Sequence, residues 1–72
     1  MSARRFEFVE GTSSKFWEIS TNGNDLTVRY GRIGTSGQSQ TKACISESAA
    51  EQQAHKQIAA KLAKGYRELA AA

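Results

Sequence analysis

Residues 15–30 read KFWEISTNGNDLTVRY, and this stretch decides the fold. Two runs rich in aromatic and β-branched residues flank the dipeptide Asn22-Gly23, which is typical of a tight two-residue hairpin turn. The second run, residues 25–30, alternates between apolar and polar residues, as expected for a strand with one buried face. Trp17 and Ile19 share one face of the first run, and Leu26, Val28 and Tyr30 share one face of the second. The stretch therefore predicts an antiparallel hairpin with a type I′ turn at Asn22-Gly23.

Further strands are predicted on both sides of this hairpin. Residues 4–10 (RRFEFVE) alternate, and the cluster at 11–14 (GTSS) predicts the turn that follows them. Residues 38–45 (QSQTKACI) predict a fourth strand. Its inner face is expected to comprise Thr41, Ala43 and Ile45. Short connections between successive strands are typical of an antiparallel meander.

The apolar residues change to a helical period at Ser46. The predicted inward stripe of the helix consists of Ala50, Ala54, Ile58 and Leu62. Residues 48–51 (SAAE) have the spacing of a capping box, with Ser46 as a competing N-cap, and Gly65 suits the position after the last turn. The expected fold is α+β, with a four-stranded antiparallel sheet packed against one long C-terminal α-helix.

Length and composition are those of one small domain. The 72 residues allow one core, expected over about residues 5–68, with 69–72 as a tail that docks or frays. One cysteine, Cys44, and one histidine, His55, provide neither a disulfide nor a zinc cluster, so no cofactor and no metal are expected. No signal peptide or membrane-length apolar run is present, which favours a cytoplasmic protein with no membrane partner.

A family resemblance rests on three stretches. Residues 30–38 (YGRIGTSGQ) resemble the signature of the WGR domain, which is named for a Trp-Gly-Arg triplet at the end of a strand. The likeness extends to residues 15–19 (KFWEI) and 61–66 (KLAKGY), and it covers about residues 6–68. The tryptophan that names the family is Tyr30 here.

The resemblance implies a nucleic-acid-binding module. WGR domains occur in bacterial proteins and in eukaryotic poly(ADP-ribose) polymerases, which detect DNA breaks. In the polymerases the tryptophan packs against the terminal nucleotide, and the arginine links the DNA contact to neighbouring domains. By position these roles would fall to Tyr30 and Arg32. Polymerase activity is not expected of a chain without zinc fingers or a transferase domain.

One window of the sequence supports the same function. Between Asp25 and Glu47 there is no acidic residue, whereas Arg29, Arg32 and Lys42 are all present. The glycine-rich connection in this window exposes backbone N–H groups that can approach a phosphate. The predicted nucleic-acid-binding residues are Tyr30, Gly31, Arg32, Arg29, Thr35, Gln38 and Lys42.

Other interpretations of these residues remain open. One alternative is that the glycines are needed only because a hairpin connection requires residues with a positive φ. Another is that Tyr30 is a core residue, since it lies on the same face of its strand as Leu26 and Val28. Arg29 and Lys42 can be solvated charges on the face of the sheet. A solvated helix face is favoured over a second nucleic-acid patch for Lys56, Lys61, Lys64 and Arg67.

Two functions therefore remain. The first is a monomeric, non-catalytic module that binds DNA ends or breaks through the surface from Tyr30 to Lys42. The second is a protein-interaction module that uses a sheet edge or the loop at residues 31–37. An enzyme is not expected, because no paired carboxylates or second histidine suggest a catalytic cleft, and no small-molecule substrate is expected.

Overall fold

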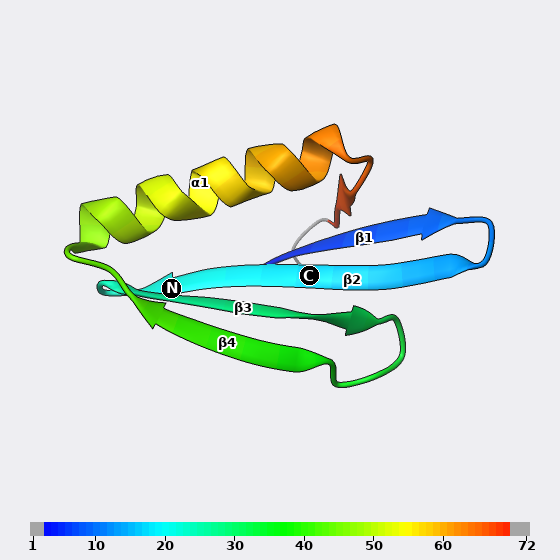
Figure 1. Ribbon diagram of the computed structural model, residues 1–72, viewed down its shortest axis with the longest axis horizontal. Helices are drawn as coiled ribbons and strands as arrows, with labels where there is room; N and C mark the ends of the chain where they lie inside the picture. The colour runs from blue at the N-terminus through cyan, green and yellow to red at the C-terminus, as the bar shows by residue number, and fades with distance from the viewer. Residues whose placement is uncertain (1–2, 70–72) are drawn as a thin grey trace.

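In the computed structural model, which describes residues 3–69, five strands form one antiparallel sheet and a helix lies across one of its faces (Figure 1). The elements in chain order are β1 (Arg4–Glu10), β2 (Ser13–Asn22), β3 (Asp25–Arg32), β4 (Gln38–Ala43), α1 (Glu47–Ala63) and β5 (Arg67–Glu68). The order across the sheet is β4-β3-β2-β1-β5, and every neighbouring pair is antiparallel. The predicted α+β class is therefore confirmed.

The fifth strand corrects the prediction of a four-stranded sheet with a C-terminal helix. β5 follows the helix and pairs with β1, where Glu68 lies opposite Phe6. The Arg4 guanidinium donates two hydrogen bonds to the Glu68 carboxylate, at 2.6 and 2.7 Å. A strand of two residues is too short to show an alternating pattern, so the sequence could not indicate it. It forms where the chain, turning back after the helix, pairs with β1.

The core lies between α1 and the central strands. Its buried residues are Phe6, Trp17, Ile19 and Leu26 from the sheet and Ala50, Ala54 and Ile58 from the helix. The rings of Phe6 and Trp17 lie 5.5 Å apart. The predicted inward position of Leu62 is wrong, because the last turn of the helix directs Lys61 toward the Trp17 ring and leaves Leu62 48% exposed.

The hairpin between β2 and β3 turns one residue later than predicted. Asn22 pairs with Asp25, so the two loop residues are Gly23 and Asn24. Gly23 has a φ of +62°, whereas no non-glycine residue described has a positive φ. A positive φ at the first loop position alone is the pattern of a type II′ turn, so the predicted type I′ turn is wrong.

The inner face of β4 is the opposite of the one predicted. Val28 pairs with Gln40, and directly opposite residues share a face, so Gln40 faces the helix. Thr41 lies on the other face, where its hydroxyl is 3.0 Å from that of Thr27. Ile45 lies beyond the end of the strand and is 96% exposed. The nearly uniform polarity of this edge strand gave no apolar alternation to indicate its inner face.

The start of α1 also differs from the preferred prediction. Ser46 is the N-cap, and its hydroxyl accepts a hydrogen bond of 3.1 Å from the N–H of Ala49. Ser48 lies inside the helix, so the capping box predicted at residues 48–51 does not form. Within residues 3–69, no helix has the length and apolarity needed to cross a membrane.

The end of α1 reverses the chain as predicted at Gly65. Gly65 has a φ of +104°, and the N–H of Tyr66 donates a 3.1 Å hydrogen bond to the carbonyl of Lys61. These features define a Schellman motif. The reversal brings the Tyr66 ring to 5.4 Å from that of Phe8 on the sheet.

The loop between β3 and β4 folds back closely on the strand that precedes it. Thr35 donates two hydrogen bonds to the carbonyl of Arg32, from its N–H at 3.1 Å and its hydroxyl at 2.7 Å. Gly37 has a φ of +69°. A Cβ at this position would overlap the carbonyl oxygen of Tyr30 and lie 2.7 Å from Cζ of Phe16. The loop conformation therefore requires glycine here.

Gly37→Ala is expected to lower the free energy of unfolding by about 2–4 kcal/mol, since the methyl group adds steric overlap to an unfavourable φ. Gly34→Ala is the matched control, because Gly34 has a φ of +95° with open space around its Cα. We expect it to cost about 1–2 kcal/mol. Urea unfolding followed by tryptophan fluorescence measures both. Equal losses of unfolding free energy in the two variants would show that steric overlap at Gly37 adds nothing to the cost of its positive φ.

Candidate nucleic-acid interface

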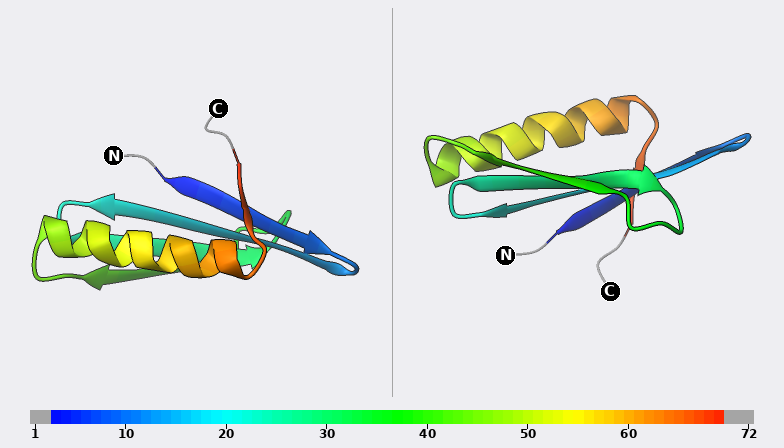
Figure 2. Two further views of the ribbon diagram at one scale, coloured as in Figure 1. Left: turned by 90° about the horizontal axis from the view of Figure 1, so that it is seen from above. Right: turned by 60° about the horizontal axis from the view of Figure 1, so that its bottom comes forward.

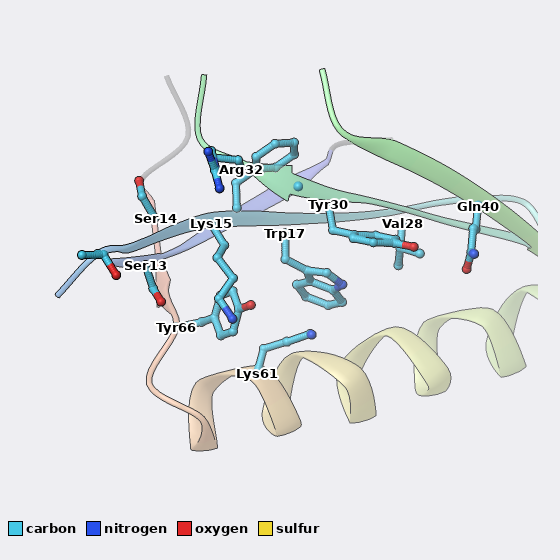
Figure 3. A pocket seen from close by; sticks show the side chains of 13 residues that line it. Ser13, Ser14, Lys15, Trp17, Val28, Tyr30, Arg32, Gln40, Lys61 and Tyr66 are labelled. Atoms are coloured by element: carbon cyan, nitrogen blue, oxygen red, sulfur yellow. The ribbon is translucent and has the colours of Figure 1, made fainter. Parts of the chain in front are cut away.

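A cleft of about 750 Å³ opens between the central strands and the C-terminal end of α1 (Figure 3). Six aromatic and cationic side chains line its helix side and its rim. They are Lys15, Trp17, Tyr30, Arg32, Lys61 and Tyr66, with Thr12, Ser13, Ser14, Phe16, Val28, Gly31 and Gln40 completing the lining. In Figure 3, Lys15, Trp17 and Tyr30 extend from the sheet toward the helix, whereas Arg32 lies at the rim, level with the sheet.

The register of β2 against β3 places the sheet residues of the cleft. Trp17 pairs with Tyr30, and Lys15 pairs with Arg32, at the next position on the same face. Side chains in such pairs have Cβ atoms roughly 4.5–5.5 Å apart. Strand pairing therefore brings Lys15 next to the two aromatic side chains, with Arg32 beyond them at the rim of the cleft.

The helix and the segment after it close the other side. Lys61 Nζ lies 5.4 Å from the ring centroid of Trp17 and 5.2 Å from that of Tyr66. Such cation–π contacts hold the ammonium group over the aromatic floor. Tyr66 reaches this position because the chain reverses at Gly65.

The electrostatics of the cleft favour an anion. None of the lining residues is acidic. Burial lowers the pKa of Lys61 below the ordinary lysine value, and the positive charges of Lys64 and Lys15 lower it further. A phosphate placed between Lys15 and Lys61 would relieve this repulsion and stabilise both charges.

Three of the predicted site residues line this cleft, namely Tyr30, Gly31 and Arg32. Tyr30 is 37% exposed, so it is not a core residue despite its parity. Gln38 pairs with Tyr30, and its amide oxygen is 3.5 Å from the tyrosine hydroxyl. Thr35 does not line the cleft, and its N–H and hydroxyl both donate hydrogen bonds to the Arg32 carbonyl within the loop.

Lys42 also lies on the helix side, at the far end of β4. It pairs with Leu26, four residues before Tyr30 in β3. It lines a neighbouring groove together with Val28 and Gln40, both of which also line the cleft. The two cavities therefore adjoin.

Arg29 is separated from the other predicted residues. It lies on the opposite face of the sheet, where its guanidinium bonds both Glu18 carboxylate oxygens at 2.9 Å and the Ser36 carbonyl at 3.0 Å. Arg5 donates to the same carboxylate at 2.7 Å. The two guanidinium groups lie 4.4 Å (Arg5) and 5.1 Å (Arg29) from the Phe16 ring centroid. The structure thus places Arg29 in an ion-pair network and not in the cleft.

Of the six aromatic and cationic side chains named above, four were not predicted as part of the site: Lys15, Trp17, Lys61 and Tyr66. Lys15 lies two residues before Trp17 in the same strand, so the two side chains share a face of the sheet, and alternation within the strand could have indicated it. Lys61 and Tyr66 come from the end of the helix, and only the tertiary fold brings them to the sheet.

The WGR domain family model matches residues 2–72. The chain belongs to the WGR family. Tyr30, Gly31 and Arg32, at the end of β3, occupy the family's triplet with tyrosine as the first residue. The resemblance stated from the sequence is confirmed, and the family signature lies on the wall of the cleft.

Similar WGR sequences occur in two proteins of Escherichia coli (strain K12). The chain is 43% identical to the uncharacterized protein YfeS over 65 residues and 40% identical to the protein YehF over 67 residues. These matches cover 90% and 93% of this chain but only 27% and 24% of the relatives. The chain therefore spans about a quarter of the length of the curated relatives that it matches.

A solved structure has the same fold. The crystal structure of a protein from Bacteroides fragilis superposes with a TM-score of 0.93 and 45% sequence identity. The match covers 96% of this chain and 20% of that protein. The same WGR fold is thus found within a longer bacterial protein.

The ion-pair network of Arg5, Glu18 and Arg29, on the face of the sheet away from the helix, should make the stability of the domain depend on pH. Burial acts to raise the pKa of Glu18, but hydrogen bonds from Arg5 and Arg29 outweigh it and hold the pKa below its ordinary value. Because the pKa is lower in the folded state, the stabilisation is present above the unfolded value of about 4.3. It is lost as the pH falls through the folded value.

Glu18→Gln is therefore expected to lower the free energy of unfolding by about 1–2 kcal/mol at neutral pH. The difference from the wild type should shrink as the pH falls below about 4. Urea unfolding at a series of pH values measures this change. Glu10→Gln is the control, since Glu10 forms no ion pair within the described part of the chain. A difference that does not vary with pH would contradict the network's role.

Proposed function

We propose that this WGR domain is a non-catalytic module that binds nucleic acid at strand ends or breaks, through the cleft between the sheet and α1. One observation carries the proposal. Lys15 and Lys61 lie beside Trp17, Tyr30 and Tyr66, with Arg32 at the rim, in a cleft whose lining contains no acidic residue. Family membership supports the same ligand class.

The groups in the cleft suit the parts of a terminal nucleotide. Tyr30 offers a partly exposed ring for stacking on a base or packing against a ribose. Lys15 and Lys61 provide positive charge for the phosphate, and Arg32 at the rim can reach the backbone beyond it. In this proposal Tyr30 performs the role that the resemblance assigns to the family's tryptophan.

The chemistry proposed is binding without bond cleavage. The lining offers ammonium, guanidinium, phenol, indole and amide groups, which recognise anions and flat rings. Among residues 3–69 no three potential metal-ligating side chains gather at one place. We propose that the domain acts in the cytoplasm, as a module that supplies nucleic-acid affinity to the protein that contains it.

Arg32→Gln and Lys15→Gln are each expected to weaken binding of a short duplex about fivefold to tenfold at low salt. Each should also reduce the slope of log affinity against log salt by about one, because one phosphate contact is lost. Fluorescence anisotropy at several salt concentrations measures both quantities. Lys56→Gln is the matched control, since it removes the same charge from an exposed helix position outside the cleft.

Binding that falls equally in all three variants would mean that only net charge matters. An unchanged affinity in Arg32→Gln and Lys15→Gln would rule out the cleft as the site. The absence of any binding at low salt would remove nucleic acid as the ligand class.

A protein partner is the second candidate, and the exposed edge of the sheet favours it. All six residues of β4 are exposed, and its outer edge is not paired to another strand within the described structure. Such an edge can accept an added strand. A purified partner whose binding is abolished by Ser39→Lys but not by Arg32→Gln would support this function over the first.

A further inference from the structure

Polar side chains from two elements line the groove between β4 and α1: Gln40 and Lys42 from the strand and Gln57 from the helix. They belong to two rows of polar residues, one on each element. The β4 row consists of Gln38, Gln40 and Lys42, which the register places on the helix side. The helix row consists of Gln53, Gln57 and Lys61, which are spaced four residues apart and are all half-buried. Each row reads glutamine, glutamine, lysine. Figure 2 shows the helix running along the sheet with β4 at the sheet's edge.

This groove adjoins the cleft and extends it. It has a volume of about 490 Å³ and is lined by Leu26, Val28, Gln40, Thr41, Lys42 and Gln57. Val28 and Gln40 also line the cleft, so the two cavities are continuous. From Leu26 to Arg32 the strand advances six residues, or roughly 20 Å. The combined channel therefore runs along most of β3.

Cations lie at both ends of this channel. Lys42 lies at one end, and Lys15, Arg32 and Lys61 lie at the other. No residue that lines either cavity is acidic. Such a charge distribution is complementary to a chain with repeated negative charges.

The polar groups along the channel are available to a ligand. Within residues 3–69 the side chains of Gln40, Lys42 and Gln57 make no hydrogen bond or ion pair, whereas Arg4, Arg5 and Arg29 on other surfaces are all paired with carboxylates. A glutamine amide both donates and accepts, so it can contact the edge of an unpaired base.

We propose that this groove holds a single-stranded extension of the nucleic acid whose end occupies the cleft. The inference rests on the proposed function and adds the form of the ligand. A phosphate of the extension lies near Lys42, and its bases contact the glutamine amides and the apolar floor of Leu26 and Val28. The proposed ligand is single-stranded, because only unpaired bases present their Watson–Crick edges to glutamine amides.

A comparison of DNA ends tests the proposal. The probes share one fluorescein-labelled duplex and differ only in the end: blunt, a 3′ extension or a 5′ extension of about four thymidines, within the length that one small domain covers. We expect one extension polarity to bind about tenfold more tightly than the blunt end, which corresponds to stacking or hydrogen bonding of one or two additional bases. Anisotropy at a fixed, near-physiological salt concentration measures the three affinities.

Two variants in the groove test whether the tighter binding of the extended duplex depends on the groove. Lys42→Gln and Gln57→Ala should each lower the affinity for the extended duplex toward that of the blunt duplex, while the control Lys56→Gln should keep the tenfold difference. Because all three residues have exposed or half-buried side chains, thermal melting should show folded proteins, and two independent variants guard against a local distortion.

The outcomes separate the groove from the cleft. Equal affinities for blunt and extended duplexes would overturn the groove's role and leave the cleft proposal standing. No binding to any probe would overturn both. If an acidic peptide such as oligoglutamate bound in a Lys42-dependent way without any preference for extended DNA, the groove would be a polypeptide site and the proposal would be wrong.

Discussion

The register of β2 against β3 is the constraint on which the rest of the structure depends. Trp17 opposite Tyr30 and Ile19 opposite Val28 put the apolar positions of both strands under the helix. The same register places Lys15 opposite Arg32 at the next position. A slip of one residue would turn the Glu18 carboxylate toward the helix and move Trp17 to the outer face. The core and the candidate site are therefore set by one pairing.

The single helix leaves the outer face of the sheet without a second layer, and β2 compensates for this. Phe16, next to Trp17 in the chain but on the opposite face, is 1% exposed. Arg5 and Arg29 cover its ring, and Glu18 holds both guanidinium groups in place. The aliphatic and planar parts of arginine thus exclude water from an aromatic ring while the charges stay paired. The outer face thus buries one aromatic ring under paired side chains without a second layer of secondary structure.

Sequence patterns predicted the elements that have strong alternation and failed where alternation is weak. The faces of β2 and β3 and the helix positions through Ile58 were correct, because apolar residues recur there at the period of the element. The face of β4 was wrong, since a strand of glutamine, serine, threonine and lysine has no preferred side until its partner sets the register. β5 has too few residues to show any period. The cap at Ser46 and the turn at Gly23 differed by one or two residues from the positions first expected, as local signals allow.

The site was harder to predict, because the face of the sheet on which a charged residue lies decides which charges neutralise it. A count of charges over a contiguous stretch of sequence does not show this. Arg29 and Arg32 lie three residues apart in an acid-free window, but a strand directs them to opposite faces. Glu18, from another strand, neutralises Arg29. Conversely, Lys15 and Lys61 are 46 positions apart in the chain and meet in one cleft. The positive charge of Lys15, Arg32 and Lys61, which form no ion pair among residues 3–69, thus lies around the cleft that Tyr30 lines. Its location follows from strand parity and the chain reversal after α1, and no count over a contiguous segment could have shown it.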